Sequence, residues 1–183
     1  MRATWLTFVA LTTPVRADPT VPPNPYDPPS ELTEAGQLDV GVGVGLWIAD
    51  GVHDVAVTPM IGRFVADNLE LAATFGVSHS KDAQASATIW SALIEPSYHL
   101  PLNPFAFGVL GMAAGVAYQG TLGASLMVAP RVGLELALSR HHLISTSLAY
   151  SYITHSAAQG RDNHALVALT SALRITLGYA IRW

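Results

Sequence analysis

Apolar residues alternate with polar or small residues along most of the chain. In the last stretch, every second residue from Leu173 to Trp183 is apolar, and the residues between them include Arg174, Gly178 and Arg182. Successive side chains of a β-strand point to opposite faces, so this pattern predicts a strand with one apolar face and one polar or small face. About ten residues of this kind are typical of a transmembrane β-barrel strand, with the apolar face toward lipid.

Seven earlier segments show the same alternation and are separated by turn residues. The eight predicted strands cover residues 37–48, 53–64, 69–78, 86–99, 105–118, 123–138, 143–154 and 165–183. An even number of antiparallel strands can close into a barrel, which leaves no unpaired edge in lipid. The sequence therefore predicts an all-β fold, an eight-stranded antiparallel transmembrane up-and-down β-barrel over residues 36–183.

The connections between these strands fall into two sets. Those at 65–68, 100–104 and 139–142 are tight, whereas those at 49–52, 79–85, 119–122 and 155–164 include the longest and most polar ones. Outer-membrane barrels place short turns in the periplasm and longer loops outside. We therefore expect both termini on the periplasmic side.

A helical membrane span is the main alternative within this region. The segment from Phe105 to Tyr118 has no charged residue and contains Gly111 and Gly115 at GxxxG spacing. It is shorter than the roughly 20 residues that a spanning helix needs. Alternation accounts for it better, and we expect a strand there.

Composition agrees with a chain that meets lipid. Half of the residues are apolar and only 12% are charged, against about a quarter in ordinary soluble domains. The sequence has no cysteine, which excludes disulfides and thiolate chemistry. It has no basic stripe interleaved with aromatic residues, so we expect no nucleic-acid partner. A soluble ligand-binding barrel would need an apolar interior, and the small, charged inner face argues against it.

The N-terminal residues predict export and a linker. Arg2 precedes a modest apolar stretch, and Val15 and Ala17 supply the small residues of a cleavage site before Asp18. We therefore predict a signal peptide over residues 1–17. Six prolines follow between residues 18 and 30, and such density favours an extended chain over helix or strand. Residues 18–35 are predicted to be a proline-rich periplasmic linker.

Two segments carry a resemblance to known proteins. The last eight residues, ending on Trp183, resemble the C-terminal signal that the assembly machinery of bacterial outer-membrane barrels reads. The segment from Pro59 to Leu71 resembles a strand-turn-strand of small outer-membrane barrels of the OmpA/OmpX-like group. The resemblance implies a Gram-negative outer-membrane location, with membrane lipids and the barrel assembly machinery as partners, and we expect a monomer. It also implies that the assembly signal comprises Gly178, Tyr179, Ile181 and Trp183.

The inner face of the predicted barrel carries charges, including Asp39 and Arg182 near the two ends of the barrel sequence. An eight-stranded lumen is just wide enough to be filled by side chains, and carboxylates pair well with guanidinium groups. We expect Arg131 and Arg174 each to bond at least one glutamate in an ion-pair network of Glu70, Glu95, Arg131, Glu135 and Arg174. Such a plugged lumen indicates a structural or surface-interaction role. Small residues on the same face could admit water, which keeps a narrow gated pore as the alternative.

Chemistry at the predicted outer rim is a weaker possibility. Imidazoles there could hold Zn²⁺ or Cu²⁺ with nearby carboxylates such as Asp54, and the weak candidates are His53, His79, His155 and His164. Each lies in a different loop or strand end, so we expect neither a metal nor a cofactor. Ser156 beside His155 would point to the opposite face of a strand. An outer-leaflet lipid-modifying enzyme is therefore the least favoured alternative, and we expect no enzyme activity.

Overall fold

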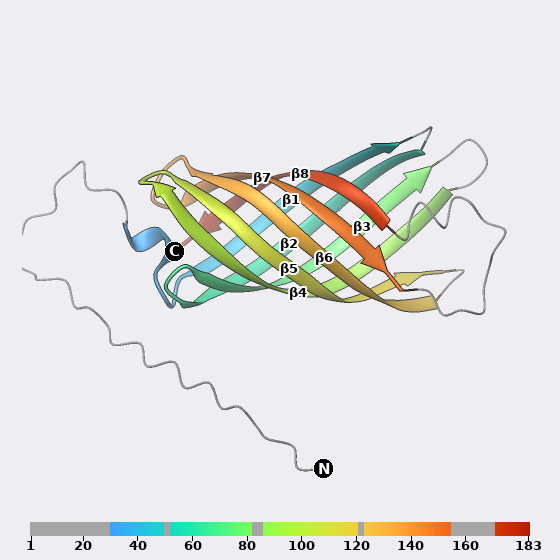
Figure 1. Ribbon diagram of the computed structural model, residues 1–183, viewed down its shortest axis with the longest axis horizontal. Coiled ribbons are helices and arrows are strands. Elements are labelled where there is room, and N and C mark those ends of the chain that lie inside the picture. The colour runs from blue at the N-terminus through green and yellow to red at the C-terminus, as the bar shows by residue number, and fades with distance from the viewer. Residues whose placement is uncertain (1–29, 50–51, 82–85, 121–122, 155–170) are drawn as a thin grey trace, which may run out of the picture.

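The predicted barrel is confirmed in a computed structural model, which describes residues 30–49, 52–81, 86–120, 123–154 and 171–183. Each strand pairs antiparallel with the next, and the last pairs with the first, so the sheet closes (Figure 1). A short 3-10 helix, η1, precedes the strands. The elements are η1 (Ser30–Thr33), β1 (Leu38–Ala49), β2 (Val52–Ala66), β3 (Leu69–Lys81), β4 (Ser86–Asn103), β5 (Ala106–Gln119), β6 (Gly123–Ala137), β7 (His142–Ile153) and β8 (Ser171–Arg182).

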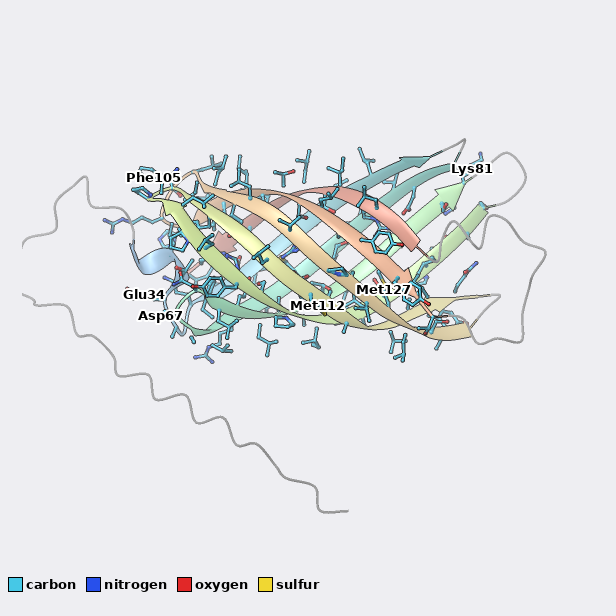
Figure 2. The ribbon with its side chains drawn as sticks, viewed as in Figure 1. Glu34, Asp67, Lys81, Phe105, Met112 and Met127 are labelled. Carbon is cyan, nitrogen blue, oxygen red and sulfur yellow. The ribbon has the colours of Figure 1, made fainter. Side chains whose placement is uncertain are left out.

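The two ends of the barrel differ in their connections. Tight turns at 67–68, 104–105 and 138–141 share one end with η1 and the C-terminus, and we call it the turn end (Figure 1). Figure 2 places Glu34, Asp67 and Phe105 there and Lys81 at the opposite, loop end. The expected grouping of the three short turns with both ends of the barrel chain is thus confirmed. Asn68 has a φ of 64°, the left-handed backbone that Asn tolerates in a tight turn.

Several strand boundaries differ from the expected ones. The alternative of a helical span from Phe105 to Tyr118 is wrong, because residues 106–119 form β5. The β4 strand continues to Asn103, so Pro101 lies inside it beside a register shift between Pro101 and Asn103. Such an irregularity accommodates a proline, which has no N–H to donate to the ladder. Of the expected last strand, residues 165–170 lie outside the described residues.

Among the described residues, no helix is long and apolar enough to cross a membrane.

The outer surface of the barrel is apolar. Outward side chains such as Leu126, Leu177 and Ile175 are between 58% and 66% exposed. Aromatic side chains gather toward both ends of this surface, with Trp90, Tyr118 and Tyr152 near the loop end and Tyr98, Phe105, Tyr179 and Trp183 near the turn end. An apolar band between two aromatic girdles is the surface that a barrel presents to a bilayer.

The inner surface is divided between apolar and charged side chains. A buried apolar cluster lines the inside of β4, β5 and β6, and it comprises Ile89, Leu93, Ala113, Ala117, Met127 and Ala129. Charged side chains occupy much of the remaining lumen. Arg131 and Arg174 both pair with buried carboxylates inside the barrel, so their expected inward orientation is correct.

The apolar band predicts how the barrel responds to a charge at mid-strand. Leu177→Arg should destabilise the barrel by about 2–4 kcal/mol, the cost of arginine near the bilayer midplane. Leu138→Arg, in an exposed turn at the barrel end, should cost only about 0–1 kcal/mol. Reversible denaturant unfolding in lipid vesicles measures both. Equal costs at the two positions would contradict a membrane-embedded outer face.

Candidate functional site

The lumen at the turn end is filled by a group of buried side chains. Six of them come from six different strands, and none is more than 8% exposed. We call them the turn-end cluster: Asp39, Phe64, Glu70, His99, Glu135 and Arg182.

Arg182 joins most of this cluster through its guanidinium group. Its Nε and Nη2 donate to Asp39 Oδ2 at 3.1 and 2.5 Å. Nη2 also donates to Glu135 Oε2 at 3.2 Å, and Nη1 donates to the Leu32 carbonyl at 3.0 Å. The guanidinium carbon lies 4.7 Å from the centre of the Phe64 ring, within cation–π range. Arg182 is therefore bonded to three different segments of the chain.

His99 completes the cluster and was missed by the sequence analysis. Its Nε2 lies 2.9 Å from Glu70 Oε2, and its Nδ1 lies 3.1 Å from Glu135 Oε2. Ser97 Oγ is 3.3 Å from both Nε2 and Glu70 Oε2. The alternation of the sequence could have identified it, because Glu95, Ser97 and His99 share one face of β4.

The segment before β1 covers the cluster, and we call residues 30–37 the arm. Leu32 is 2% exposed, and its carbonyl accepts the bond from Arg182. Thr33 is bonded twice to Asn68, since its Oγ1 donates to Asn68 Oδ1 and its carbonyl accepts from the Asn68 N–H. The Gly36 N–H donates to the Phe64 carbonyl at 2.7 Å. The sequence analysis placed residues 18–35 in the linker, but Leu32 and Thr33 of that range are buried against the barrel.

A second ion pair lies in the lumen beyond the cluster. Arg131 Nη2 is 2.6 Å from Glu95 Oε1. The pair crosses β5 at Gly111, where an added Cβ would clash with Glu95 Oε1. Arg131 thus bonds one of the three glutamates named by the sequence analysis.

Arg174 has a different partner from the one expected. The expected bond to a glutamate is wrong, because Arg174 Nη2 donates to Asp54 Oδ2 at 2.6 Å. The reason is register: Leu46 of β1 lies opposite Val55 on one side and Ile175 on the other, which brings Asp54 and Arg174 to the same height. Asp54, which the sequence analysis placed at the outer rim, is 3% exposed and faces the lumen.

Cavities lie between these charged groups. One of about 110 Å³ is lined by residues that include Glu135, Arg131, Arg174, Ser145 and Ser147. A second of about 30 Å³ lies beside Asp54 and Arg174 toward the loop end. Hydroxyl-bearing residues and both arginines line this region. The space is polar and large enough to hold a few water molecules.

The candidate metal ligands are not brought together where they are described. His79 is exposed, and its Nδ1 lies 3.0 Å from Thr88 Oγ1. The His53 side chain, His155 and His164 lie outside the described residues. Within the described part of the chain, no three His, Asp or Glu side chains are grouped as ligands for a metal ion.

The residues of the expected assembly signal lie on β8 and at its end. Tyr179, Ile181 and Trp183 face outward, while Gly178 faces the lumen beside Ser145. The Tyr179 hydroxyl is 2.5 Å from His142 Nδ1. Leu38 and Trp183 exchange two backbone hydrogen bonds, which extend the pairing of β1 with β8 to the last residue.

Comparison with solved structures places this architecture among the small eight-stranded transmembrane β-barrels. The N-terminal β-barrel domain of Pseudomonas aeruginosa OprF is similar, with a TM-score of 0.53, 16% identity, and coverage of 81% of this chain and 98% of that one. The outer membrane protein OprG from Pseudomonas aeruginosa is similar with a TM-score of 0.55 and 11% identity, and the match covers 82% of this chain and 97% of that one. Neisserial surface protein A is similar with a TM-score of 0.53 and 12% identity, and the match covers 80% of this chain and 94% of that one.

No protein-family model matches the sequence, and no curated protein sequence is significantly similar to it.

The Asp54–Arg174 pair predicts a specific pattern of stability. Arg174→Ala should destabilise the barrel by about 3 kcal/mol, because it leaves a buried carboxylate without its counter-charge. Adding Asp54→Asn should restore part of that loss. Arg140→Ala, in an exposed turn, serves as the control and should change little. Denaturant unfolding of the single and double variants measures the coupling, and strictly additive effects would contradict the pairing.

Proposed function

We propose that this protein is an integral outer-membrane barrel of a Gram-negative bacterium, with a structural or surface-interaction role and a lumen closed by buried ion pairs. The apolar outer band with its aromatic girdles supports a bilayer location. The fold shared with OprF, OprG and the neisserial surface protein supports the outer membrane in particular. By the rule that short turns face the periplasm, the turn end and both termini are periplasmic.

The observation that carries the closed lumen is the capped turn-end cluster. Arg182 and His99 project into the lumen, where an open channel would leave them accessible to water, yet both are at most 1% exposed. Side chains therefore fill the space around them. Leu32 then covers Arg182 from the turn end and accepts one of its hydrogen bonds. A hydrated ion would have to displace Leu32, Phe64 and the ion pairs together.

A narrow gated pore is the second candidate, and the cavities favour it. Space for a few water molecules lies between the cluster and the Asp54–Arg174 pair. If the turn-end cluster rearranged, this space would join the solvent at the turn end. A pore would therefore require a rearrangement of that cluster.

Catalysis is a poorer fit to the lumen. Ser97, His99 and Glu135 follow the order of a Ser-His-acid triad, with Oγ to Nε2 at 3.3 Å and Nδ1 to Oε2 at 3.1 Å. His99 Nε2 is nearer to Glu70, however, and Ser97 is 2% exposed and does not line either cavity. A substrate has no described route to this serine, and we therefore propose a role without catalysis.

Ion conductance tests the closed lumen. The unaltered protein in planar bilayers should show no conductance above that of lipid alone. The double variant Leu32→Ala/Phe64→Ala removes the apolar seal while keeping every charge, and it should produce conductance steps. Phe75→Ala deletes an equally large side chain from the lipid-facing surface, where Phe75 is 59% exposed, and should remain silent. Steps from the unaltered protein would favour the gated pore.

We also propose that the end of β8 is the assembly signal, with Gly178, Tyr179, Ile181 and Trp183 as its residues. Deleting Trp183 should reduce the amount of heat-modifiable barrel in the outer membrane, because it removes the last position of the outward row. Trp90→Ala is the matched control, since Trp90 is 58% and Trp183 56% exposed on the same apolar surface. An equal loss in both variants would indicate a general lipid contact instead of a signal.

A further inference from the structure

The contacts of His99 with two carboxylates require one extra proton, shared among these three side chains. A neutral imidazole carries one N–H and can donate only one hydrogen bond. Here both ring nitrogens face carboxylate oxygens, at 2.9 Å from Glu70 and 3.1 Å from Glu135. An unprotonated nitrogen facing a carboxylate would set two lone pairs against each other. The trio of Glu70, His99 and Glu135 therefore carries one proton more than two carboxylates and a neutral imidazole.

The other charged groups around this trio come from β1, β4 and β8. Arg182 bonds Glu135 and Asp39, and Asp39 Oδ1 and Glu70 Oε1 are buried without a hydrogen-bond partner. Losing the extra proton would leave three carboxylates with one guanidinium in a closed space, and buried charges without partners are costly. The groups around the trio are Asp39 on β1, Phe64 on β2, Glu95 and Ser97 on β4 and Arg182 on β8.

Two connections link the protonated trio to the arm. Arg182 bonds Glu135 through Nη2 and the Leu32 carbonyl through Nη1. On the other side, the backbone carbonyl of Asn68 accepts a hydrogen bond from the His99 backbone N–H at 2.8 Å. The backbone N–H of Asn68 donates to the Thr33 carbonyl, and its Oδ1 accepts from the Thr33 hydroxyl. A shift of His99 or Arg182 would therefore disturb the groups that hold the arm down.

We propose that the turn-end cluster and the arm form a proton-dependent latch, in which the proton shared by Glu70, His99 and Glu135 keeps the arm closed over the lumen. The protonated trio favours the closed arm, so closure is complete while the proton is bound and weakens as the pH rises and the proton leaves. This regulation goes beyond the proposed role of the barrel, because it concerns the pH at which the turn end opens and not the function of the barrel.

Thiol accessibility tests the latch in the folded protein. The chain has no cysteine, so Leu32→Cys introduces a single thiol at a position that is 2% exposed. Its rate of modification by a small, water-soluble methanethiosulfonate reagent is measured in nanodiscs from neutral to alkaline pH. Glu34→Cys, at an exposed position in the same arm, corrects for the rise in thiolate with pH. The quantity compared is the ratio of the two rates.

The ratio should rise at least about tenfold toward alkaline pH, the factor expected for the loss of a charge-assisted hydrogen bond. With His99→Gln added, which cannot titrate, the ratio should stay constant across the series. A ratio that is constant with His99 present overturns the latch. A rise of equal size with His99→Gln also overturns it, because another group would then control the arm.

A second variant covers the case in which His99→Gln does not fold. Glu70→Gln supplies an amide N–H that can donate to the unprotonated Nε2 of His99, so the trio no longer needs its extra proton. The ratio should then remain low to a higher pH than in the unaltered background. An unchanged midpoint in Glu70→Gln overturns the proposed role of the proton. Heat-modifiability on gels confirms that each variant is a folded barrel before labelling.

Discussion

A strand edge cannot be left open in lipid, because its unpaired N–H and C=O groups would have no water to bond. The pairing of β1 with β8, from Asp39 opposite Arg182 to Leu46 opposite Ile175, removes that edge. The same pairing places the aspartate and the arginine side by side in the lumen, although they are separated by most of the barrel sequence. Closing the sheet therefore also builds the Asp39–Arg182 pair of the turn-end cluster.

A closed lumen of eight strands is narrow, and space inside it comes from the smallest residues. A Cβ added at Gly62 would overlap the carboxylate of Glu70, and one at Gly111 would clash with that of Glu95. The small inner residues were interpreted in the sequence analysis as room for water. At these two positions carboxylates take up the space instead, and at Gly111 this lets the Arg131–Glu95 pair cross β5. Water-sized space is left farther along, between the pairs.

Alternation along the strands was enough to predict the closed barrel, the inward orientation of the charges and the end that holds the turns. It could not predict partners, because a period of two gives the face of a residue but not its height along the barrel axis. Height depends on the register of neighbouring strands, and a register shift of two residues moves a side chain to another layer without changing its face. Arg174 pairs with Asp54 for this reason, across a strand and 120 residues away in sequence. Arg131 and Glu95 meet only because β5 between them carries a glycine at the crossing.

The arm shows a different limit of sequence reasoning. Residues 30–35 have no strand or helix period, so nothing local distinguishes them from the prolines before them. What fixes them is tertiary: Leu32 fills the mouth of the lumen, and Asn68 and Arg182 supply their hydrogen bonds. These partners lie on the β2–β3 turn and on β8, and Arg182 reaches its place only when β8 closes on β1. The arm can therefore dock fully only on a finished barrel, which ties the cover of the lumen to the completion of the fold.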